Sequence, residues 1–353
     1  MKVLGIESSC DETSAAVVED SCKLLSVVTN SSMNLHAIYG GVVPEIAARS
    51  HIEAINPVIE QALDQANCTW DDIDAIAVTY GAGLGGSLLI GVLAARTLAI
   101  IKNKPLYAIN HVEAHVYANF LTETPLPGYS LPAKVPEFPM LALIVSGGHS
   151  QLVLFKNHFD YNLLGQTQDD AIGEAFDKVA KIIGLPYPGG PSVSKKALEG
   201  DPNKFQLPKA HMHEKYDFSF SGLKTAVLRL AQQQIGEDFT FPSKNLPDRL
   251  NEAQKADIAA SFQRVAIETV VDKTIMAFEE FHPKSVVIAG GVAASAELRR
   301  QLSDLLAIPI AYTDPKLCTD NGAMIATLGC FKAMLGQPTT DPYSLDIQPN
   351  LSM

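Results

Sequence analysis

The chain has 353 residues, of which 47% are hydrophobic and 19% are charged, and this excludes a disordered protein and suits two domains with buried cores. Its net charge of −12 disfavours binding of nucleic acid over a broad surface, so such a contact needs a local basic patch or a helper protein. The five cysteines form no CxxC pair, which predicts reduced thiols in a cytoplasmic protein rather than a disulfide framework.

No targeting or membrane segment is expected. The amino terminus becomes acidic at Glu7, too early for a signal peptide, and no apolar run is expected to reach the length of a membrane span. The first region predicts three short strands in an antiparallel meander, over residues 3–7, 14–18 and 24–28.

A long amphipathic helix is predicted over residues 44–65, followed by a strand over residues 73–79. The strand ends in a glycine-rich turn, residues 81–87, and a helix over residues 88–102 comes next. Such a turn can cradle an anion on backbone N–H groups, or it can pack a helix closely on a strand. The turn lacks the Lys-Ser/Thr ending of a P-loop, and both interpretations stay open.

Two histidines, His111 and His115, stand four residues apart at the start of a predicted helix. Residues with this spacing lie one turn apart on the same face, so both imidazoles can reach one metal ion. The strand predicted over residues 105–109 runs directly into His111, and open α/β sheets bind ligands at the carboxyl ends of their strands. Spacing alone leaves the alternative of two unrelated helix histidines.

After a proline-rich linker over residues 122–139, the opening pattern of strand, polar turn, strand and strand recurs. The recurrence, over residues 140–145, 151–155 and 161–165, predicts two lobes of the same design. The second lobe then predicts a helix over residues 171–183, a less regular part up to about residue 250 and a long helix to about residue 281. A buried strand at 285–289, an edge strand at 308–312 and a final helix capped by Thr319 complete the pattern.

Three turns of small residues predict a nucleotide site. The turns at Ser8 and Ser9 and at residues 146–149 can point backbone N–H groups and hydroxyls at a phosphate held between the lobes. The turn at Gly290 and Gly291 suits a purine or a ribose close to the backbone. Each turn alone is compatible with ordinary turn chemistry, but three in two similar lobes favour a nucleotide.

Two carboxylates are candidates for the same chemistry. Asp320, at the start of the final helix, is a candidate third metal ligand, and two histidines with one carboxylate leave coordination positions open. The alternative for Asp320 is a first-turn residue favoured by the helix dipole. Asp177 can hold ribose hydroxyls, or it can be a solvated partner of Lys178 or Lys181.

Eight motifs in order resemble the tRNA adenosine threonylcarbamoyltransferases, the family once labelled glycoproteases, in its bacterial and organellar branch. They are GIESSCDET (5–13), GGVVPE (40–45), HVEAH (111–115), VSGGH (145–149), GEAFDK (173–178), YPGGP (187–191), DFSFSGLKT (217–225) and CTDNGA (318–323). The resemblance implies an α/β protein of the actin-like ATPase (ASKHA) fold, with two duplicated lobes around a nucleotide cleft. The first lobe is expected over residues 1–115, rejoined by a carboxyl-terminal helix at about 325–353. The second is expected over 116–324, with an irregular insertion at about 191–250.

The resemblance also implies an acyltransferase. It would move the threonylcarbamoyl group from threonylcarbamoyl-AMP to the exocyclic N6 amine of the tRNA adenosine next to the anticodon, forming t6A and releasing AMP. The family's metal ligands fall on His111, His115 and Asp320, with Fe²⁺ expected and Zn²⁺ as the alternative. Its adenylate contacts fall on Ile144, Val145, Ser146, Gly147, Gly148, Asp177 and Gly190. Ser295 stands where the family has an asparagine, and Asp11 and Glu12 are the only candidates for a general base.

The partners implied are tRNA, threonylcarbamoyl-AMP, a related non-catalytic subunit on the first-lobe helices and a small ATPase, with no membrane. Candidate tRNA contacts are Lys195, Lys196, Lys224, Arg299 and Arg300, although an ordinary solvated surface position is the favoured interpretation for each. The rival functions are a small-molecule kinase of the same fold and a metalloprotease. A protease of this type needs Glu directly after the first histidine. Here Val112 occupies that position, and Glu113 lies about 100° further around the helix.

Overall fold

The computed structural model describes residues 1–353, which fold into two compact α/β units. Unit 1 comprises Met1–Pro136 and Ala311–Met353, and unit 2 comprises Glu137–Ile310. Unit 2 is therefore shorter at both ends than the second lobe expected from the sequence, residues 116–324.

Residues 116–136 belong to unit 1 because their backbone bonds to its amino-terminal strands and to its returning carboxyl-terminal segment. The Leu24 N–H donates to the Glu123 carbonyl at 2.8 Å, and the Thr122 N–H donates to the Cys22 carbonyl at 2.9 Å. Further along, the Ser130 N–H donates to the Asp314 carboxylate at 2.7 Å. These bonds join segments far apart in the sequence, which hydrophobic periodicity does not report.

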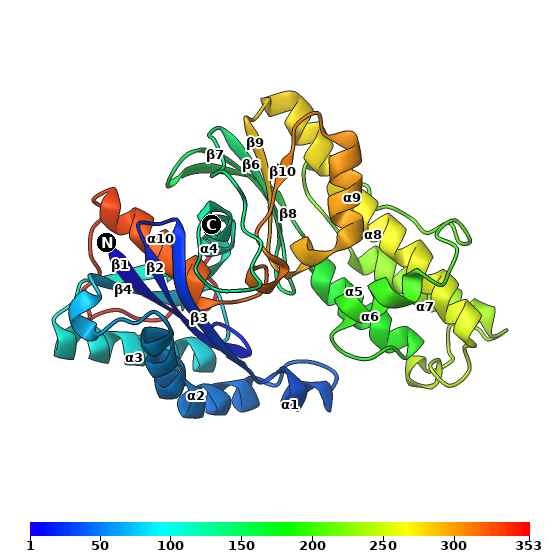
Figure 1. Cartoon of the computed structure of the whole chain (residues 1–353). Coiled ribbons are helices and arrows are strands. Elements are labelled where there is room, and N and C mark those ends of the chain that lie inside the picture. The colour runs from blue at the N-terminus through cyan, green and yellow to red at the C-terminus, as the bar shows by residue number, and fades with distance from the viewer. The chain divides into compact units, whose positions relative to one another are not determined.

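Unit 1 is built on a five-stranded sheet in the order β3-β2-β1-β4-β5 (Figure 1). Its strands are β1 (Lys2–Glu7), β2 (Glu12–Glu19), β3 (Lys23–Ser31), β4 (Ala75–Gly81) and β5 (Leu106–Asn110). The first three form the predicted antiparallel meander, and β4 and β5 run parallel to β1.

Helices cover both faces of this sheet. They are α1 (Met33–Ala37), α2 (Pro44–Gln65), α3 (Gly85–Lys102), α4 (His111–Tyr117) and α10 (Gly322–Met334), with short 3₁₀ turns η1 (Trp70–Asp72), η2 (Ala118–Phe120) and η5 (Pro315–Leu317). On β1, Leu4 and Ile6 pack in one core with residues of α2 and α3. Gly5, between them, faces α10 so closely that a Cβ would lie 2.3 Å from the Gly322 carbonyl oxygen. Because alternate strand residues face opposite sides, α10 lies on one face and α2 and α3 on the other.

One helix, α3, is long and apolar enough to cross a membrane by length and composition, which the sequence analysis did not expect. A core helix of a folded unit passes the same test. In the structure α3 packs against α2 and β4, and Leu88, Val92 and Ala95 on that face are buried. The Arg96 guanidinium donates three hydrogen bonds to backbone oxygens of the carboxyl-terminal segment, residues 342–345. These contacts account for α3 as a structural helix of unit 1.

Unit 2 repeats the sheet of unit 1, in the order β10-β9-β6-β7-β8. Its strands are β6 (Met140–Val145), β7 (Ser150–Asn157), β8 (Asp160–Gln166), β9 (Ser285–Ala289) and β10 (Ile310–Ala311). The first three are again an antiparallel meander, and β9 runs parallel to β6. Written in the opposite direction, this order is β8-β7-β6-β9-β10, which matches β3-β2-β1-β4-β5 of unit 1 strand for strand. The match confirms the predicted duplication and the α/β class.

The helices of unit 2 are α5 (Ile172–Ile183), α6 (Gly189–Ala197), α7 (Ser221–Gln234), α8 (Glu252–Phe281) and α9 (Ala296–Leu305), with η3 (Ser243–Asn245) and η4 (Gly291–Ala294). The insertion expected to be irregular therefore contains α7. Leu223, Val227 and Ala231 form its buried stripe, four residues apart. The Asp169 carboxylate accepts from the N–H groups of Phe220 and Ser221 at the start of this helix.

Candidate metal centre

The two histidines lie on one short helix that begins where a strand ends. Strand β5 stops at Asn110, whose side-chain oxygen accepts hydrogen bonds from the N–H groups of Val112 at 2.8 Å and Glu113 at 3.2 Å. This N-cap starts α4 at His111, so both histidines fall within its first two turns. The predicted helix is confirmed, although it continues after Tyr117 as the 3₁₀ turn η2.

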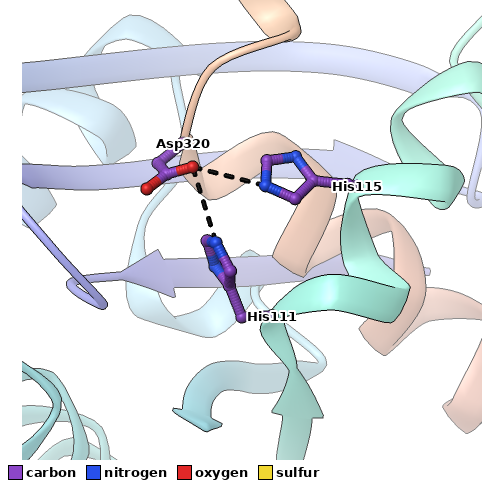
Figure 2. A group of neighbouring side chains, drawn as sticks. All are labelled: His111, His115 and Asp320. Atoms are coloured by element: carbon purple, nitrogen blue, oxygen red, sulfur yellow. Dashed lines mark ion pairs between the residues drawn. The ribbon is translucent and has the colours of Figure 1, made fainter. Parts of the chain in front are cut away.

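Asp320 approaches from the segment before α10. The sequence predicted Thr319 as the cap of that helix, and this was wrong: the N-cap is Asn321, which accepts from Ala323 and Met324 N–H groups and donates to two carbonyls upstream. Because the cap is two residues later, Asp320 lies outside the helix, and its carboxylate points at the histidines (Figure 2). The helix-dipole interpretation of Asp320 is not needed.

The three side chains meet with the spacing of ligands around one ion. Asp320 Oδ1 lies 3.5 Å from His111 Nε2 and 3.3 Å from His115 Nε2. The candidate ligand atoms all lie within 4.8 Å of one another. Two ligands bound at about 2.1 Å to a tetrahedral or octahedral metal stand roughly 3.0–3.5 Å apart. The separations from the carboxylate match that range.

The surroundings of the His115 ring nitrogens suit a metal ligand better than a histidine that is only part of the core. Its side chain is 2% exposed, and neither of its ring nitrogens makes a hydrogen bond. Asp320 is within ion-pair distance of Nε2 but does not satisfy it by hydrogen-bond geometry. Leaving a buried donor or acceptor unsatisfied costs about 1–3 kcal/mol, and a cation between the three side chains would remove that cost for Nε2. The cluster can therefore hold a metal ion.

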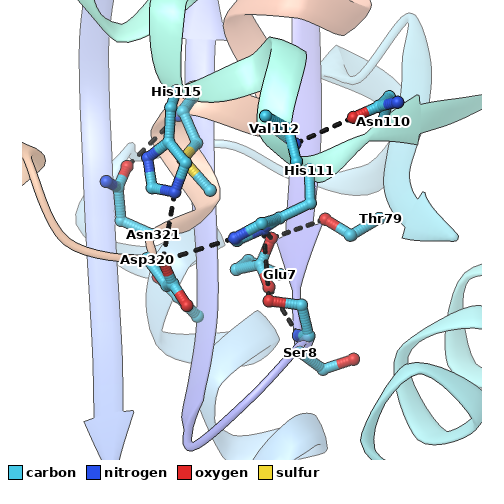
Figure 3. A network of polar contacts seen from close by, with 12 residues as sticks. Glu7, Ser8, Thr79, Asn110, His111, Val112, His115, Asp320 and Asn321 are labelled. Carbon is cyan, nitrogen blue, oxygen red and sulfur yellow. Dashed lines mark hydrogen bonds and ion pairs between the residues drawn. The ribbon is translucent and has the colours of Figure 1, made fainter. Parts of the chain in front are cut away.

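A buried carboxylate, Glu7, orients His111 from behind (Figure 3). Glu7 Oε2 lies 3.1 Å from His111 Nδ1 and accepts from Thr79 Oγ1 at 2.6 Å, while Oε1 accepts from the Ser9 N–H at 2.5 Å. A carboxylate only accepts, so it holds the proton on Nδ1 and leaves Nε2 as the ligand atom. Burial lowers the pKa of His111, but the charges of Glu7 and Asp320 outweigh it and raise that pKa to about 9. The site thus favours positive charge. Sequence reasoning missed Glu7, although it lies in the first motif.

The acidic residue of helix α4, Glu113, faces away from this cluster. Its side chain is 6% exposed, and burial raises its pKa to about 7, against the lowering effect of Lys332 on α10. Lys332 itself donates to the Ala108 carbonyl. A buried carboxyl group beside α10 is not placed as the base of a metalloprotease, which agrees with the spacing argument.

Of the candidate bases, Glu12 is the first residue of β2 and Asp11 directly precedes it, and the charge of Asp320 acts on Glu12. Burial, together with Asp11 and Asp320, raises the pKa of Glu12 to about 9. Glu12 also accepts a hydrogen bond from Ser31 Oγ at 2.9 Å. Being protonated at neutral pH, Glu12 is a poor base.

The turn at Ser8 and Ser9 and the glycine-rich turn at residues 81–87 form hydrogen bonds within the protein. Ser8 Oγ donates to the Ser87 carbonyl at 3.0 Å, and the Ser9 N–H is bonded to Glu7. In the glycine-rich turn, the Gly83 N–H donates to the Pro349 carbonyl and the Leu84 N–H to the Ser9 carbonyl. These bonds, with the close contacts of Gly81 and Gly83, support the close-packing interpretation of residues 81–87.

The predicted adenylate residues of unit 2 gather at the carboxyl end of β6. Ile144 and Val145 are buried at its end, and Ser146 closes the next turn by accepting from the His149 N–H at 3.1 Å. Gly147 and Gly148 are exposed and face open space. A Cβ on Gly173 of α5 would lie 2.6 Å from the Ser146 carbonyl oxygen, and one on Gly290 would lie 2.5 Å from that of Val145. The turn, the start of α5 and the Gly290 turn thus converge.

Asp177 and Gly190 come together, while Ser295 caps a helix. Asp177 Oδ1 accepts from the N–H of Gly189, the residue before Gly190, at 2.6 Å. Lys178 pairs with Asp170 and Glu174. Ser295 is the N-cap of α9, and its hydroxyl accepts from the Leu298 N–H at 3.4 Å.

Comparison with known proteins agrees with the sequence resemblance. Residues 23–327 match the family model described as tRNA N6-adenosine threonylcarbamoyltransferase. A protein of that name from Thermomicrobium roseum is 50% identical over 100% of this chain and 97% of its own length. The protein of that name from Symbiobacterium thermophilum is 50% identical over 93% of this chain and 91% of its own length. The one from Dehalococcoides mccartyi is 46% identical over 100% of this chain and 99% of its own length.

Among solved structures, full-length HypF in its phosphate- and nucleotide-bound form matches with a TM-score of 0.56 at 12% identity. The match covers 95% of this chain and 46% of HypF. At this identity the likeness shows the fold alone, in agreement with the predicted actin-like class.

Proposed function

The chain belongs to the tRNA N6-adenosine threonylcarbamoyltransferase family, and we propose that the metal centre of unit 1 has a role in acyl transfer and that the glycine turn of unit 2 has a role in holding the donor. The protein is a transferase that attaches a threonylcarbamoyl group to N6 of a tRNA adenosine. The donor in this proposal is threonylcarbamoyl-AMP and the acceptor is the adenosine next to the anticodon. The N6 amine bonds to the carbamoyl carbon, the bond from that carbon to the phosphate oxygen breaks, and AMP leaves with the electron pair.

The observation that carries the proposal is the cluster of His111, His115 and Asp320, with its unsatisfied buried imidazole. These side chains would hold one divalent metal, Fe²⁺ in the first place and Zn²⁺ as the alternative, since two histidines and a carboxylate suit both. When bound, it supplies Lewis-acid polarisation and a template for acyl-phosphate oxygens. Glu7 keeps His111 in the tautomer that such a ligand needs.

The turn of Ser146, Gly147 and Gly148 would hold the AMP phosphate on backbone N–H groups, which stabilises the leaving group. The open space around both glycines supports this role, since a side chain there would obstruct a phosphate. Ile144 and Val145, at the end of β6, fix the position of the turn.

Asp177 and Gly190 would contact the ribose and the purine. Ser295 would lie near them with a shorter reach than the family asparagine. Serine and asparagine are both good N-cap residues, so Ser295→Asn keeps the start of α9 and tests the contact alone.

Asp11 is the better candidate for the base that accepts the amine proton. Of the two candidates, Glu12 is kept protonated by burial, with a pKa of about 9. The protonated Glu12 can instead donate a hydrogen bond, whereas it cannot take up a second proton.

The proposed setting is the cytoplasm, with a related non-catalytic subunit and a small ATPase as partners. Exposed apolar side chains on the first three helices support docking of the related subunit there. They are Leu35, Ile38, Ile52, Leu89, Leu93 and Ile101.

The test is reconstitution with threonylcarbamoyl-AMP and unmodified tRNA, with and without the partner proteins, followed by nucleoside analysis of the tRNA. We expect t6A with the wild type and a loss of at least about 100-fold for His111→Ala. His213→Ala, at a side chain that is 98% exposed, is the matched control and keeps full activity. No product in any combination would refute the proposed function.

A further inference from the structure

Unit 2 contains a pocket of about 280 Å³ whose lining includes Lys224, one of the candidate tRNA contacts. It is lined by Lys178, Lys181 and Ile182 of α5, Lys224, Thr225 and Leu228 of α7, and Ser243 and Lys244 of η3. Four of these eight residues are lysines, and none is acidic or aromatic. We call Lys178, Lys181, Lys224 and Lys244 with the space between them the lysine pocket.

Two of the four ammonium groups are held in place by one carboxylate. Asp170, whose side chain is 13% exposed, pairs with Lys178 Nζ at 2.6 Å and with Lys224 Nζ at 2.8 Å, through different oxygens. Lys178 also pairs with Glu174 at 2.8 Å. Asp170 therefore brings lysines of α5 and α7 together and restricts their side-chain motion.

The other two ammonium groups provide the surplus charge. Lys181 and Lys244 are exposed and form no ion pair. Four lysines stand against the carboxylates of Asp170 and Glu174, which leaves a surplus of two positive charges. In a chain of net charge −12, such a surplus is the local basic patch that a nucleic-acid contact requires.

Most of the lining surface is apolar, and its only charged groups are lysine ammonium groups, which favour a phosphate ligand. Lysine ammonium groups bind phosphate as point charges, and the Ser243 hydroxyl adds a neutral donor. Without an aromatic side chain, the pocket offers no platform on which a base could stack. Phosphate contacts of this kind position a nucleic acid and do not read its sequence.

We propose that the lysine pocket binds backbone phosphates of the tRNA substrate. The inference rests on the proposed function, which makes tRNA the acceptor. Its location within unit 2 agrees with that role, because Lys178 follows Asp177 directly on α5. Consecutive helical residues differ by about 100° in direction, so Asp177 faces α6 while Lys178 faces the lysine pocket. One helix would thus contact both the adenylate and the tRNA.

The test uses the full-length double variant Lys181→Ala/Lys244→Ala, which breaks no ion pair. Binding of unmodified tRNA is measured at several salt concentrations. If each lysine meets one phosphate, the slope of log Kobs against log[salt] falls by about 0.7–0.9 per lysine, and affinity near 0.1 M salt falls by roughly tenfold or more. The control variant Lys156→Ala/Lys284→Ala removes two exposed lysines elsewhere in unit 2 and should keep the wild-type slope.

A second measurement follows acylation of Lys181 and Lys244 by an amine-reactive reagent, with and without tRNA. Protection of both lysines is expected. An unchanged slope or an absence of protection overturns the lysine pocket and leaves the proposed function untouched. Weaker binding of inorganic phosphate or AMP by the variant, with tRNA binding unchanged, also overturns it, since the ligand is then a free phosphate. Loss of tRNA binding by the variant, while the wild type makes no t6A, supports the lysine pocket and refutes the proposed function.

Discussion

Replacement of Glu7 by glutamine should weaken metal binding without unfolding unit 1. Glu7 is 0% exposed and bonds to Ser9, Thr79 and His111. Glutamine has the same shape, but one of its two ends donates instead of accepting. The neutral amide also removes the charge that holds the proton on His111 Nδ1. The imidazole is then less basic. Its proton is also free to move to Nε2, and a protonated Nε2 has no lone pair for a metal.

The expected magnitude follows from what such supporting carboxylates contribute elsewhere. Loss of a partner behind a metal-bound histidine typically lowers metal affinity by about 10- to 100-fold, which is roughly 1.4–2.7 kcal/mol. Competition with a chromophoric chelator measures this directly, for Fe²⁺ under anaerobic conditions and for Zn²⁺, and requires no activity assay. Thermal unfolding of the metal-free variant shows whether the fold is retained.

The matched control for this experiment is Glu113→Gln. Glu113 is a buried carboxyl group on the same helix as the histidines, but it faces Lys332 and bonds to neither histidine. Its replacement should leave metal affinity unchanged. Equal affinities for Glu7→Gln and the wild type, with the fold retained, would refute the orienting role of Glu7.

Three further changes test other parts of the structure. Burial lowers the pKa of His51, so the neutral ring is favoured in the folded state, and the unfolded state binds more protons as the pH falls below about 6.5. The neutral His51 therefore contributes stability above that pH, and this contribution is lost as the pH falls below it. In urea titrations between about pH 5 and 7, His51→Gln should reduce the decrease of the unfolding free energy with falling pH. The same pH dependence in the variant and the wild type would contradict this role of His51. Gly173→Ala places a Cβ 2.6 Å from the Ser146 carbonyl oxygen and should cost about 1–3 kcal/mol, with weaker binding of AMP by calorimetry. Normal AMP affinity would show that the turn tolerates displacement. Arg96→Ala removes three hydrogen bonds to the backbone of residues 342–345 and should destabilise unit 1 by about 2–4 kcal/mol, with faster proteolysis of the carboxyl-terminal segment. Proteolysis at the wild-type rate would count against this anchoring.

Elements with a clear local pattern were predicted well. The helix over residues 44–65 and the strand over residues 140–145 match α2 and β6 residue for residue. The recurrence of strand, turn, strand and strand became two sheets of the same order. Periodicity alone suffices here because each element buries one face or lies wholly within the core.

Errors arose where bonds between distant segments decide the structure. Residues 116–136 looked like the start of a second lobe, yet their backbone pairs with β3 and with the segment before α10. The insertion around α7 looked irregular because the carboxylate that caps this helix, Asp169, comes from a distant loop. Neither bond leaves a trace in the local sequence.

The sequence by itself determined that His111 and His115 share a helix face, because their spacing equals one helical turn. It also determined the family, through eight motifs in order. Only the tertiary structure decided that Asp320 reaches both histidines and that Glu7 supports His111 from behind. It likewise assembled the lysine pocket from three separate elements. Local spacing fixes which side chains share a face, whereas chain folding fixes which faces meet, and a site needs both.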